Sequence, residues 1–284
     1  MKNIFTFVLT AMVSFLMIAQ VSSSDQATLI KIYDATDGAN WKTKWDLASS
    51  VSSWYGVKVE GNKIVSLNLS NNNLTGALPI EITNLVDLQE LNLHRNKISG
   101  TIPADLDKLK DLKVLNISFN QLSGTIPVTI CNLTKLQNVS LFMNRLSGNL
   151  PAQIGDLQNL ETLSLFNNEI EGEIPVSLYE IANLKILLLN SNKLTGELSY
   201  HISDMKSLEN LSLFENNFVG QIPFELEKLN QLKEMNISYN KFSGLISRRL
   251  AVLDTLNMTM FNEKGVAVLL NVAMDIQRPL VSEE

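Results

Sequence analysis

The sequence predicts an α/β solenoid: a curved stack of coils with a parallel β-sheet on the concave face and irregular or 3-10 segments on the convex face. Three observations lead to this fold class. Eight consecutive units of 24 residues share one register without an insertion, and an asparagine fills the ninth place of every unit. A glycine follows four residues later, also in every unit. The units begin at Ile64, Leu88, Leu112, Leu136, Leu160, Leu184, Leu208 and Leu232.

Each unit is predicted to open with a short β-strand. In the fifth unit, for example, Leu163 and Leu165 alternate with polar residues, which is the period of a strand buried on one side. One unit cannot bury its own leucines. Like strands must therefore lie side by side in a parallel sheet, with the return segments on the opposite face.

The asparagine place falls where the chain leaves the strand. A side-chain amide there can hydrogen-bond the buried backbone of its own turn and of the next coil. The eight residues are Asn72, Asn96, Asn120, Asn144, Asn168, Asn192, Asn216 and Asn240. The glycine that follows suits a bend with positive φ, and the Ile-Pro pair after it suits an extended segment.

This pattern resembles the plant-type leucine-rich repeat, and the resemblance covers residues 64–255. The motif is highly specific for the fold. Because members of the family mainly serve as scaffolds that bind other molecules, the resemblance implies a binding function with a ligand set by the variable places.

The segment before the repeats resembles the N-terminal cap of such proteins without its disulfide. Three residues match the cap pattern C-x-W-x-G-V-x-C: Trp54, Gly56 and Val57. Ser52 and Val59 stand where the cysteines would be, and Cys131 is the only cysteine, so an internal disulfide is impossible. With residues 29–41, this cap resembles the cysteine-free secreted versions of Bacteroidetes bacteria.

Four regions follow from these patterns: a signal peptide at 1–23, an N-terminal cap at 24–63, the repeats at 64–255, and a C-terminal cap and tail at 256–284. Lys2 and the apolar stretch 4–19 are typical of a secretory signal. An uncleaved membrane anchor is the alternative, but polar residues interrupt the short stretch. We expect a secreted or cell-surface protein, or a periplasmic one in a bacterium, without a membrane span in the mature chain.

Within the cap, Ser24 or Asp25 is expected to begin a helix that runs through about Thr36. Three tryptophans have the bulk to cover the open end of the first coil. We interpret them as structural: Trp41, Trp45 and Trp54.

No arrangement typical of an enzyme is found. Cys131 falls in a return segment and His94 on a strand, so they cannot form a catalytic pair. His94 and His201 fall on different faces and do not make a metal site. The formal net charge of −6 argues against nucleic-acid binding. We therefore expect no catalytic residues, no metal and no cofactor.

Candidate ligand-binding residues lie on the concave sheet, at the places beside the inward leucines. Phenylalanine recurs at the seventh place of three units, and the sixth unit has apolar residues at outward places where Asn190 leaves a gap. The predicted site comprises Phe119, Phe142, Met143, Phe166, Ile186, Leu188, Phe214 and Tyr239. Contiguous exposed apolar surface typically marks an interaction site. The alternative is that these side chains merely pack against one another.

A second candidate is a basic row just after the asparagine place in every second unit: Lys97, Arg145, Lys193 and Lys241. Such a row can line an anionic polymer, although a solvated rim is the simpler interpretation. The sequence thus predicts a monomeric scaffold that binds a protein or a polysaccharide on its concave sheet. The alternative function is a structural or adhesive surface component without a discrete ligand.

Overall fold

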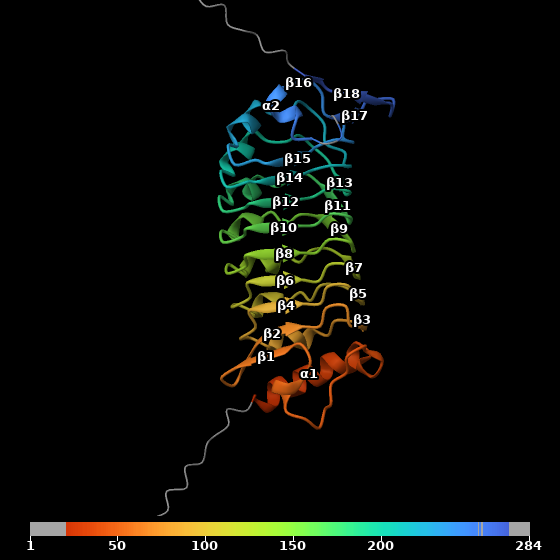
Figure 1. The fold of residues 1–284 in the computed structure, drawn as a ribbon, viewed down its shortest axis with the longest axis vertical. Helices are drawn as coiled ribbons and strands as arrows, with labels where there is room; N and C mark the ends of the chain where they lie inside the picture. Colours follow the sequence, from red (N-terminus) through yellow and green to blue (C-terminus); the bar gives the residue numbers. More distant parts are fainter. Residues whose placement is uncertain (1–20, 255, 257, 273–284) are drawn as a thin grey trace, which may run out of the picture.

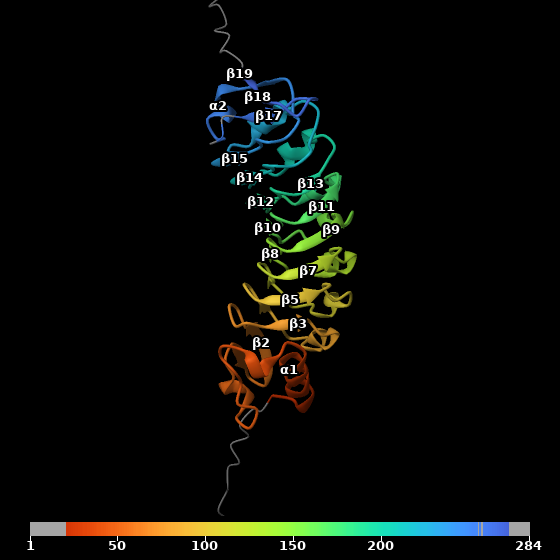
Figure 2. The same cartoon turned by 90° about the vertical axis from the view of Figure 1, so that its right-hand side faces the viewer.

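The computed structural model describes residues 21–254, 256 and 258–272. The coils stack into an elongated, bowed rod (Figures 1 and 2). Most of the predicted signal peptide and the tail 273–284 lie outside the described residues.

The concave side is a nine-stranded sheet. Its strands, in spatial order, are β1 (Val57–Glu60), β2 (Lys63–Asn68), β4 (Glu90–Asn92), β6 (Val114–Asn116), β8 (Asn138–Ser140), β10 (Thr162–Ser164), β12 (Ile186–Leu188), β14 (Asn210–Ser212) and β15 (Glu234–Asn236). Parallel neighbours pair at an offset of one unit, as Leu163 does with Leu187. Only β1 is antiparallel, to β2. The structure confirms the predicted solenoid with one strand at the start of each unit.

A second parallel sheet, which the sequence analysis missed, follows the asparagine turns. It contains β3 (Thr75–Ala77), β5 (Lys97–Gly100), β7 (Gln121–Gly124), β9 (Arg145–Asn149), β11 (Glu169–Gly172) and β13 (Lys193–Leu194). The pattern predicted only an extended segment here. Extended segments stacked one coil apart satisfy one another's main-chain groups by pairing, which explains the second sheet. Each strand leads into a left-handed glycine bend, as at Gly172 with a φ of 76°.

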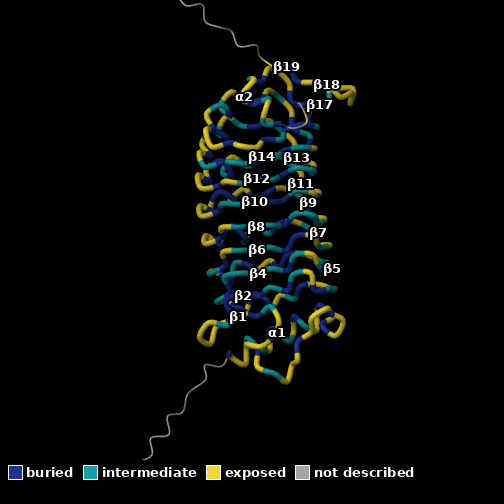
Figure 3. Tube along the Cα trace, viewed as in Figure 1, coloured by how far each residue is buried: buried dark blue, intermediate teal, exposed yellow. Residues whose placement is uncertain are grey.

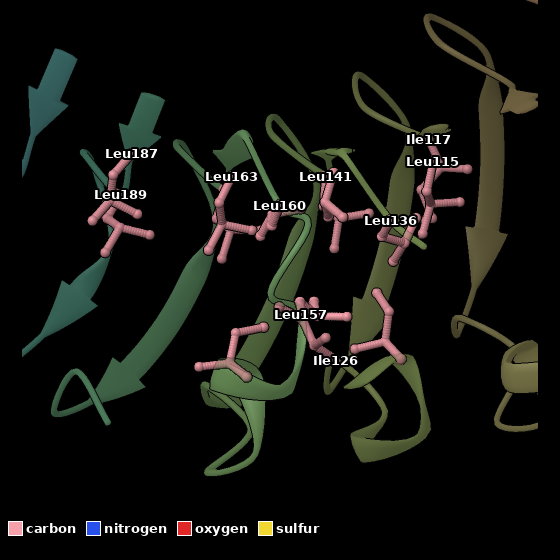
Figure 4. Packing of buried hydrophobic residues seen from close by; sticks show 14 of the residues in the cluster. Leu115, Ile117, Ile126, Leu136, Leu141, Leu157, Leu160, Leu163, Leu187 and Leu189 are labelled. Atoms are coloured by element: carbon pink, nitrogen blue, oxygen red, sulfur yellow. The ribbon is translucent and has the colours of Figure 1, made fainter. Parts of the chain in front are cut away.

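The convex side consists of short 3-10 turns after the Ile-Pro place. They are η3 (Ile80–Asn84), η4 (Leu106–Lys108), η5 (Val128–Asn132), η6 (Ile154–Asp156), η7 (Val176–Glu180), η8 (Tyr200–Asp204) and η9 (Phe224–Lys228). Between these turns and the concave sheet lies one continuous leucine-rich core (Figures 3 and 4). Leu136, Leu160 and Leu163 are typical members, each almost fully buried. The core runs the length of the described solenoid, so it gives the concave sheet a rigid support.

The asparagines form the predicted ladder, but each bonds the preceding coil and not the next one. Asn168 donates from Nδ2 to the carbonyl oxygens of Leu141 (3.1 Å) and Leu165 (2.9 Å). Its Oδ1 accepts the N–H of Leu146 at 3.0 Å. One side chain therefore satisfies three backbone groups, and it links its own turn to the preceding coil.

The N-terminal cap begins earlier than expected. Helix α1 spans Ser23–Ala35, and the Ser22 hydroxyl, rather than Ser24 or Asp25, caps it by accepting the N–H of Asp25 at 3.0 Å. Val21 is already part of the core. The short turns η1 (Gly38–Asn40) and η2 (Val51–Ser53) connect α1 to β1.

The tryptophans are structural. Trp41, Trp45 and Trp54 are buried, and Trp45 stacks on Trp54 with ring centroids 4.7 Å apart. Each indole N–H donates to a main-chain carbonyl, as buried tryptophans require. Aromatic packing thus closes this end in place of the family's disulfide.

At the C-terminal end of the nine-stranded sheet, a carboxylate takes the place of a further strand. Beyond β15, the buried Asp254 accepts the N–H of Ile237 (2.9 Å), which has no further strand to pair with, and also that of Ser238 (3.2 Å). The remaining elements are β16 (Leu245–Ile246), α2 (Arg248–Ala251), β17 (Thr259–Phe261), β18 (Ala267–Leu269) and β19 (Asn271–Val272). Met260 lies in β17 and is fully buried.

We expect the lone thiol to be inert and reductant to have no effect. Burial raises the pKa of Cys131 to about 11, and the thiolate is the reactive form, so labelling rises only as the pH approaches that value. At pH 8, Ellman's reagent should label the folded monomer negligibly and the denatured chain fully. Its melting temperature should be equal with and without dithiothreitol. Rapid labelling of the folded protein, or a melting shift, would contradict this.

Candidate functional site

The predicted aromatic residues lie along one row of the concave face, just beyond the strand ends. Phe142 and Phe166 follow β8 and β10, and their rings stack with centroids 4.4 Å apart and planes at 10°. His94 and Phe119 extend this group, with the His94 ring 6.0 Å from both Phe119 and Phe142. The structure therefore brings together three of the predicted residues and adds His94, which the prediction did not include.

A second aromatic group lies towards the C-terminal end of the row. Phe214 meets Tyr239 edge to face at 5.2 Å, and Tyr239 lies 5.4 Å from Phe261. Phe261 was not predicted, because it comes from β17 after the repeat register has ended. Asn190 occupies the place between Phe166 and Phe214 and separates the two groups.

The sixth unit has apolar side chains on the concave side of β12. Ile186 and Leu188 flank the buried Leu187, and both are half-buried. Ile186 pairs with Thr162 and Asn210, and Leu188 with Ser164 and Ser212. The sixth unit therefore places two apolar side chains between polar residues of the neighbouring strands. Both side chains come before Asn190 in the chain.

The aromatic row is less exposed than the sequence predicted. Phe142, Phe166 and Phe214 are all half-buried, as is Met143, because neighbouring rings cover part of each other. Phe119 is the most exposed of the predicted residues, at 45%. Mutual packing thus accounts for part of this surface, and the rest remains partly open from the third to the eighth unit.

The eighth place carries bulky side chains on an unfavourable backbone. In all eight units this residue is left-handed, with φ between 52° and 58°. Asparagine tolerates that conformation, as at Asn71 and Asn167. For larger residues it lowers the stability of the fold by roughly 1–2 kcal/mol. Phe119, Met143 and Tyr239 occupy it nonetheless. Stability alone does not explain these residues at this place.

His94 is held in one tautomer by its neighbours. The Ser118 hydroxyl donates its proton to Asn116 Oδ1 at 2.6 Å, so it accepts from His94 Nδ1 at 2.8 Å. Burial, and secondarily the charge of Arg95, holds the pKa of His94 below its ordinary value. The imidazole is therefore neutral at pH 7, and its Nε2 is a hydrogen-bond acceptor at one end of the aromatic row.

The other candidates do not form sites among the described residues. The basic row is interrupted, since Glu169 lies between Arg145 and Lys193 and pairs with Lys193 at 2.7 Å. Cys131 lies in η5 on the convex side, away from His94. The described part contains no cluster of three or more potential metal ligands. It also contains no helix long and apolar enough to cross a membrane.

Comparison with protein families agrees with this architecture. The profile of the leucine-rich repeat region matches residues 130–258, and the single leucine-rich repeat matches 63–85, 87–109 and 111–133. A search of curated protein sequences found no match. Among solved structures, the ectodomain of the Arabidopsis thaliana receptor kinase SOBIR1 is 30% identical, with 61% of this chain and 95% of that chain covered and a TM-score of 0.54. The chain belongs to the leucine-rich repeat family.

Two further structures are similar over more of the chain. The plant peptide hormone receptor RGFR1, in complex with RGF2, is 32% identical over 74% of this chain, with a TM-score of 0.65. The chain spans only 32% of that receptor. A plant ice-binding protein is 28% identical, with 80% of this chain and 89% of that chain covered and a TM-score of 0.63.

Proposed function

We propose that the protein is a non-enzymatic interaction scaffold that binds a protein or peptide on the concave face of its central units. The observation that carries this proposal is the aromatic row over the fourth to seventh units. Large apolar side chains on an open sheet, in part on a left-handed backbone, are costly for stability and useful for binding. A leucine-rich repeat has no need of them for its fold.

The similar structures support a protein or peptide ligand over a polysaccharide. RGFR1 is in complex with RGF2, and the receptor kinase HAESA is in complex with the peptide hormone IDA and a co-receptor. HAESA is 27% identical to this chain, with a TM-score of 0.56. RGF2 and IDA are ligands of those receptors, and we propose a protein or peptide ligand for this chain by analogy.

We further propose that the mature protein acts as a monomer outside the cell, at the cell surface or in a bacterial periplasm. The similar receptor ectodomains and the predicted signal peptide support this location. The aromatic cap that stands in for the disulfide supports a cysteine-free secreted type like those of Bacteroidetes. Mass analysis of exported protein should show a mature chain that begins between residues 20 and 25.

A capture experiment tests the binding function. Immobilised mature protein is incubated with extracellular and cell-surface extracts, beside a variant with Phe142, Phe166 and Phe214 replaced by alanine. The matched control replaces three convex residues that are more exposed: Val128, Val176 and Phe224, at 56%, 57% and 75%. We expect the wild type and the convex control to capture the same protein and the concave variant to lose it.

Two outcomes would overturn the proposal. Equal capture by the concave variant would place binding elsewhere, and capture of a polysaccharide alone would change the ligand class. A structural or adhesive component predicts a third pattern, in which no discrete partner is captured and only deletion of whole units impairs surface adhesion.

Replacing Phe119 by asparagine should separate stability from binding. Phe119 is exposed and its φ is 58°, so asparagine should raise the free energy of unfolding by up to about 1 kcal/mol. The same change should weaken capture. Denaturant melts and the capture assay measure the two effects. A variant that is less stable and binds normally would show that Phe119 serves the fold.

A further inference from the structure

One backbone N–H in each repeat lacks a main-chain acceptor, and the four outer units, the first to third and the eighth, satisfy it with a side chain. It belongs to the seventh residue, just before the left-handed turn. In the second and third units, Asn92 Oδ1 accepts the N–H of His94 at 3.1 Å and Asn116 Oδ1 accepts that of Ser118 at 3.2 Å. The first and eighth units have the same bond, from Ser70 to Asn68 and from Ser238 to Asn236.

The four central units lack this asparagine. The fifth place holds Ser140, Ser164, Leu188 and Ser212 instead. Within the described structure, the N–H groups of Phe142, Phe166, Asn190 and Phe214 donate no hydrogen bond to another protein group. We name these four N–H groups the donor row. The hydroxyl of Ser164, which is only 4% exposed, also lacks a partner. The four residues are half-buried on the concave face, so their backbone N–H groups are free to pair with a ligand.

The carbonyl groups of the same residues are all in use. Phe142 O accepts from Phe119 N at 2.8 Å, and Phe166 O accepts from Met143 N at 2.9 Å. Asn190 O and Phe214 O accept from Asn167 N and Ser191 N at 3.0 and 2.8 Å. The main chain of this row therefore has unused donors and no equally unused acceptors. Three of the four donors belong to phenylalanines, so apolar rings lie beside them.

We propose that the donor row binds a proline-rich segment in the polyproline II conformation. Such a segment has carbonyl acceptors but few N–H donors, and its pyrrolidine rings suit an aromatic-lined surface. Its repeat also fits, because three residues rise about 9.3 Å and two strand separations span about 9.6 Å. Carbonyls one turn apart can thus meet N–H groups two units apart, such as those of Phe142 and Asn190. This inference rests on the proposed concave binding site and specifies its ligand.

Binding of a deca-proline peptide tests the proposal directly. We expect acetylated deca-proline to bind the mature protein in a calorimetric titration, and a Gly-Ser decapeptide of equal length not to bind. Equal affinity for the two peptides, or no binding of deca-proline, would overturn the proposal. A glycan that competes for the site while deca-proline does not bind would also overturn it.

Two substitutions restore the missing acceptor while they keep the aromatic rings. Ser140→Asn and Ser212→Asn place at these half-buried sites the residue that the outer units use. Each variant should melt at or above the wild-type temperature and bind deca-proline about fivefold to tenfold more weakly, the loss expected for one hydrogen bond. The matched control Asn68→Ser removes the acceptor of Ser70 in the first unit, outside the aromatic row. It should lower the melting temperature and leave deca-proline binding unchanged.

Each result of the variants decides the question. Lower melting temperatures for both serine-to-asparagine variants would show that asparagine does not satisfy the donor row. Unchanged affinity in variants that fold well would show that these N–H groups do not contact the peptide. A random peptide library separates the two proposals. Peptides selected by the wild type and not by the triple phenylalanine variant, without enriched proline, would overturn only the ligand class, whereas no selection would overturn both proposals.

Discussion

Replacing Asn168 by leucine is expected to lower the free energy of unfolding by about 3 kcal/mol. Leucine has the branched shape of asparagine, although it is larger, and it makes none of the three hydrogen bonds. It leaves the carbonyls of Leu141 and Leu165 and the N–H of Leu146 without partners in the buried middle of the ladder. Denaturant unfolding monitored by circular dichroism measures the loss.

The control for this variant is an asparagine with one exposed bond. Asn183 donates to the Gln158 carbonyl at 2.8 Å on the solvent side. Asn183→Leu should change the free energy of unfolding by no more than about 0.5 kcal/mol. If the two variants had equal midpoints, the ladder would not stabilise the fold in the middle of the solenoid.

Replacing Phe166 by alanine is expected to weaken ligand binding by about 1–3 kcal/mol, the range of a central aromatic anchor. Phe166 stacks on Phe142 and faces the gap at Asn190, so its removal opens the middle of the row. The triple variant that lacks Phe142, Phe166 and Phe214 should lose measurable binding. Titration of the captured ligand against each variant measures the change.

Two controls keep this result specific. Glu180→Ala alters an exposed convex residue and should affect neither binding nor folding. Thermal melts should show that the phenylalanine variants remain folded, because the three rings lie above the core and do not belong to it. Wild-type affinity in the triple variant would exclude the aromatic row as the binding site.

The fold could be predicted from the sequence because the same pattern of buried and turn residues recurs in every repeat. Eight copies of the strand pattern and eight ladder asparagines leave one arrangement that buries the leucines and pairs the turns. The same reasoning identified Trp41, Trp45 and Trp54 as parts of the cap. It could not identify Asp254, which acts as the last acceptor of the sheet only after the repeat has ended.

The candidate site was predicted in outline. Strand alternation placed Phe142, Phe166 and Phe214 on the concave side, but it could not show that the first two rings stack and cover each other. The donor row was also missed, although the sequence contains its signal. Asparagine at the fifth place gives way to serine or leucine in the same units that carry Phe142, Phe166 and Phe214. This replacement can be interpreted only when it is known which backbone N–H the fifth-place asparagine bonds in the other units, and the structure shows that bond.

Amide hydrogen exchange of the mature protein, with and without the captured ligand, tests the concave binding site most directly. Without ligand, the amides of Phe142, Phe166, Asn190 and Phe214 should exchange faster than those of His94 and Ser118, which have side-chain acceptors. Ligand should slow exchange mainly within residues 138–143, 162–167, 186–191 and 210–215. Protection confined to the convex turns, or unchanged exchange along the concave strands, would contradict the account.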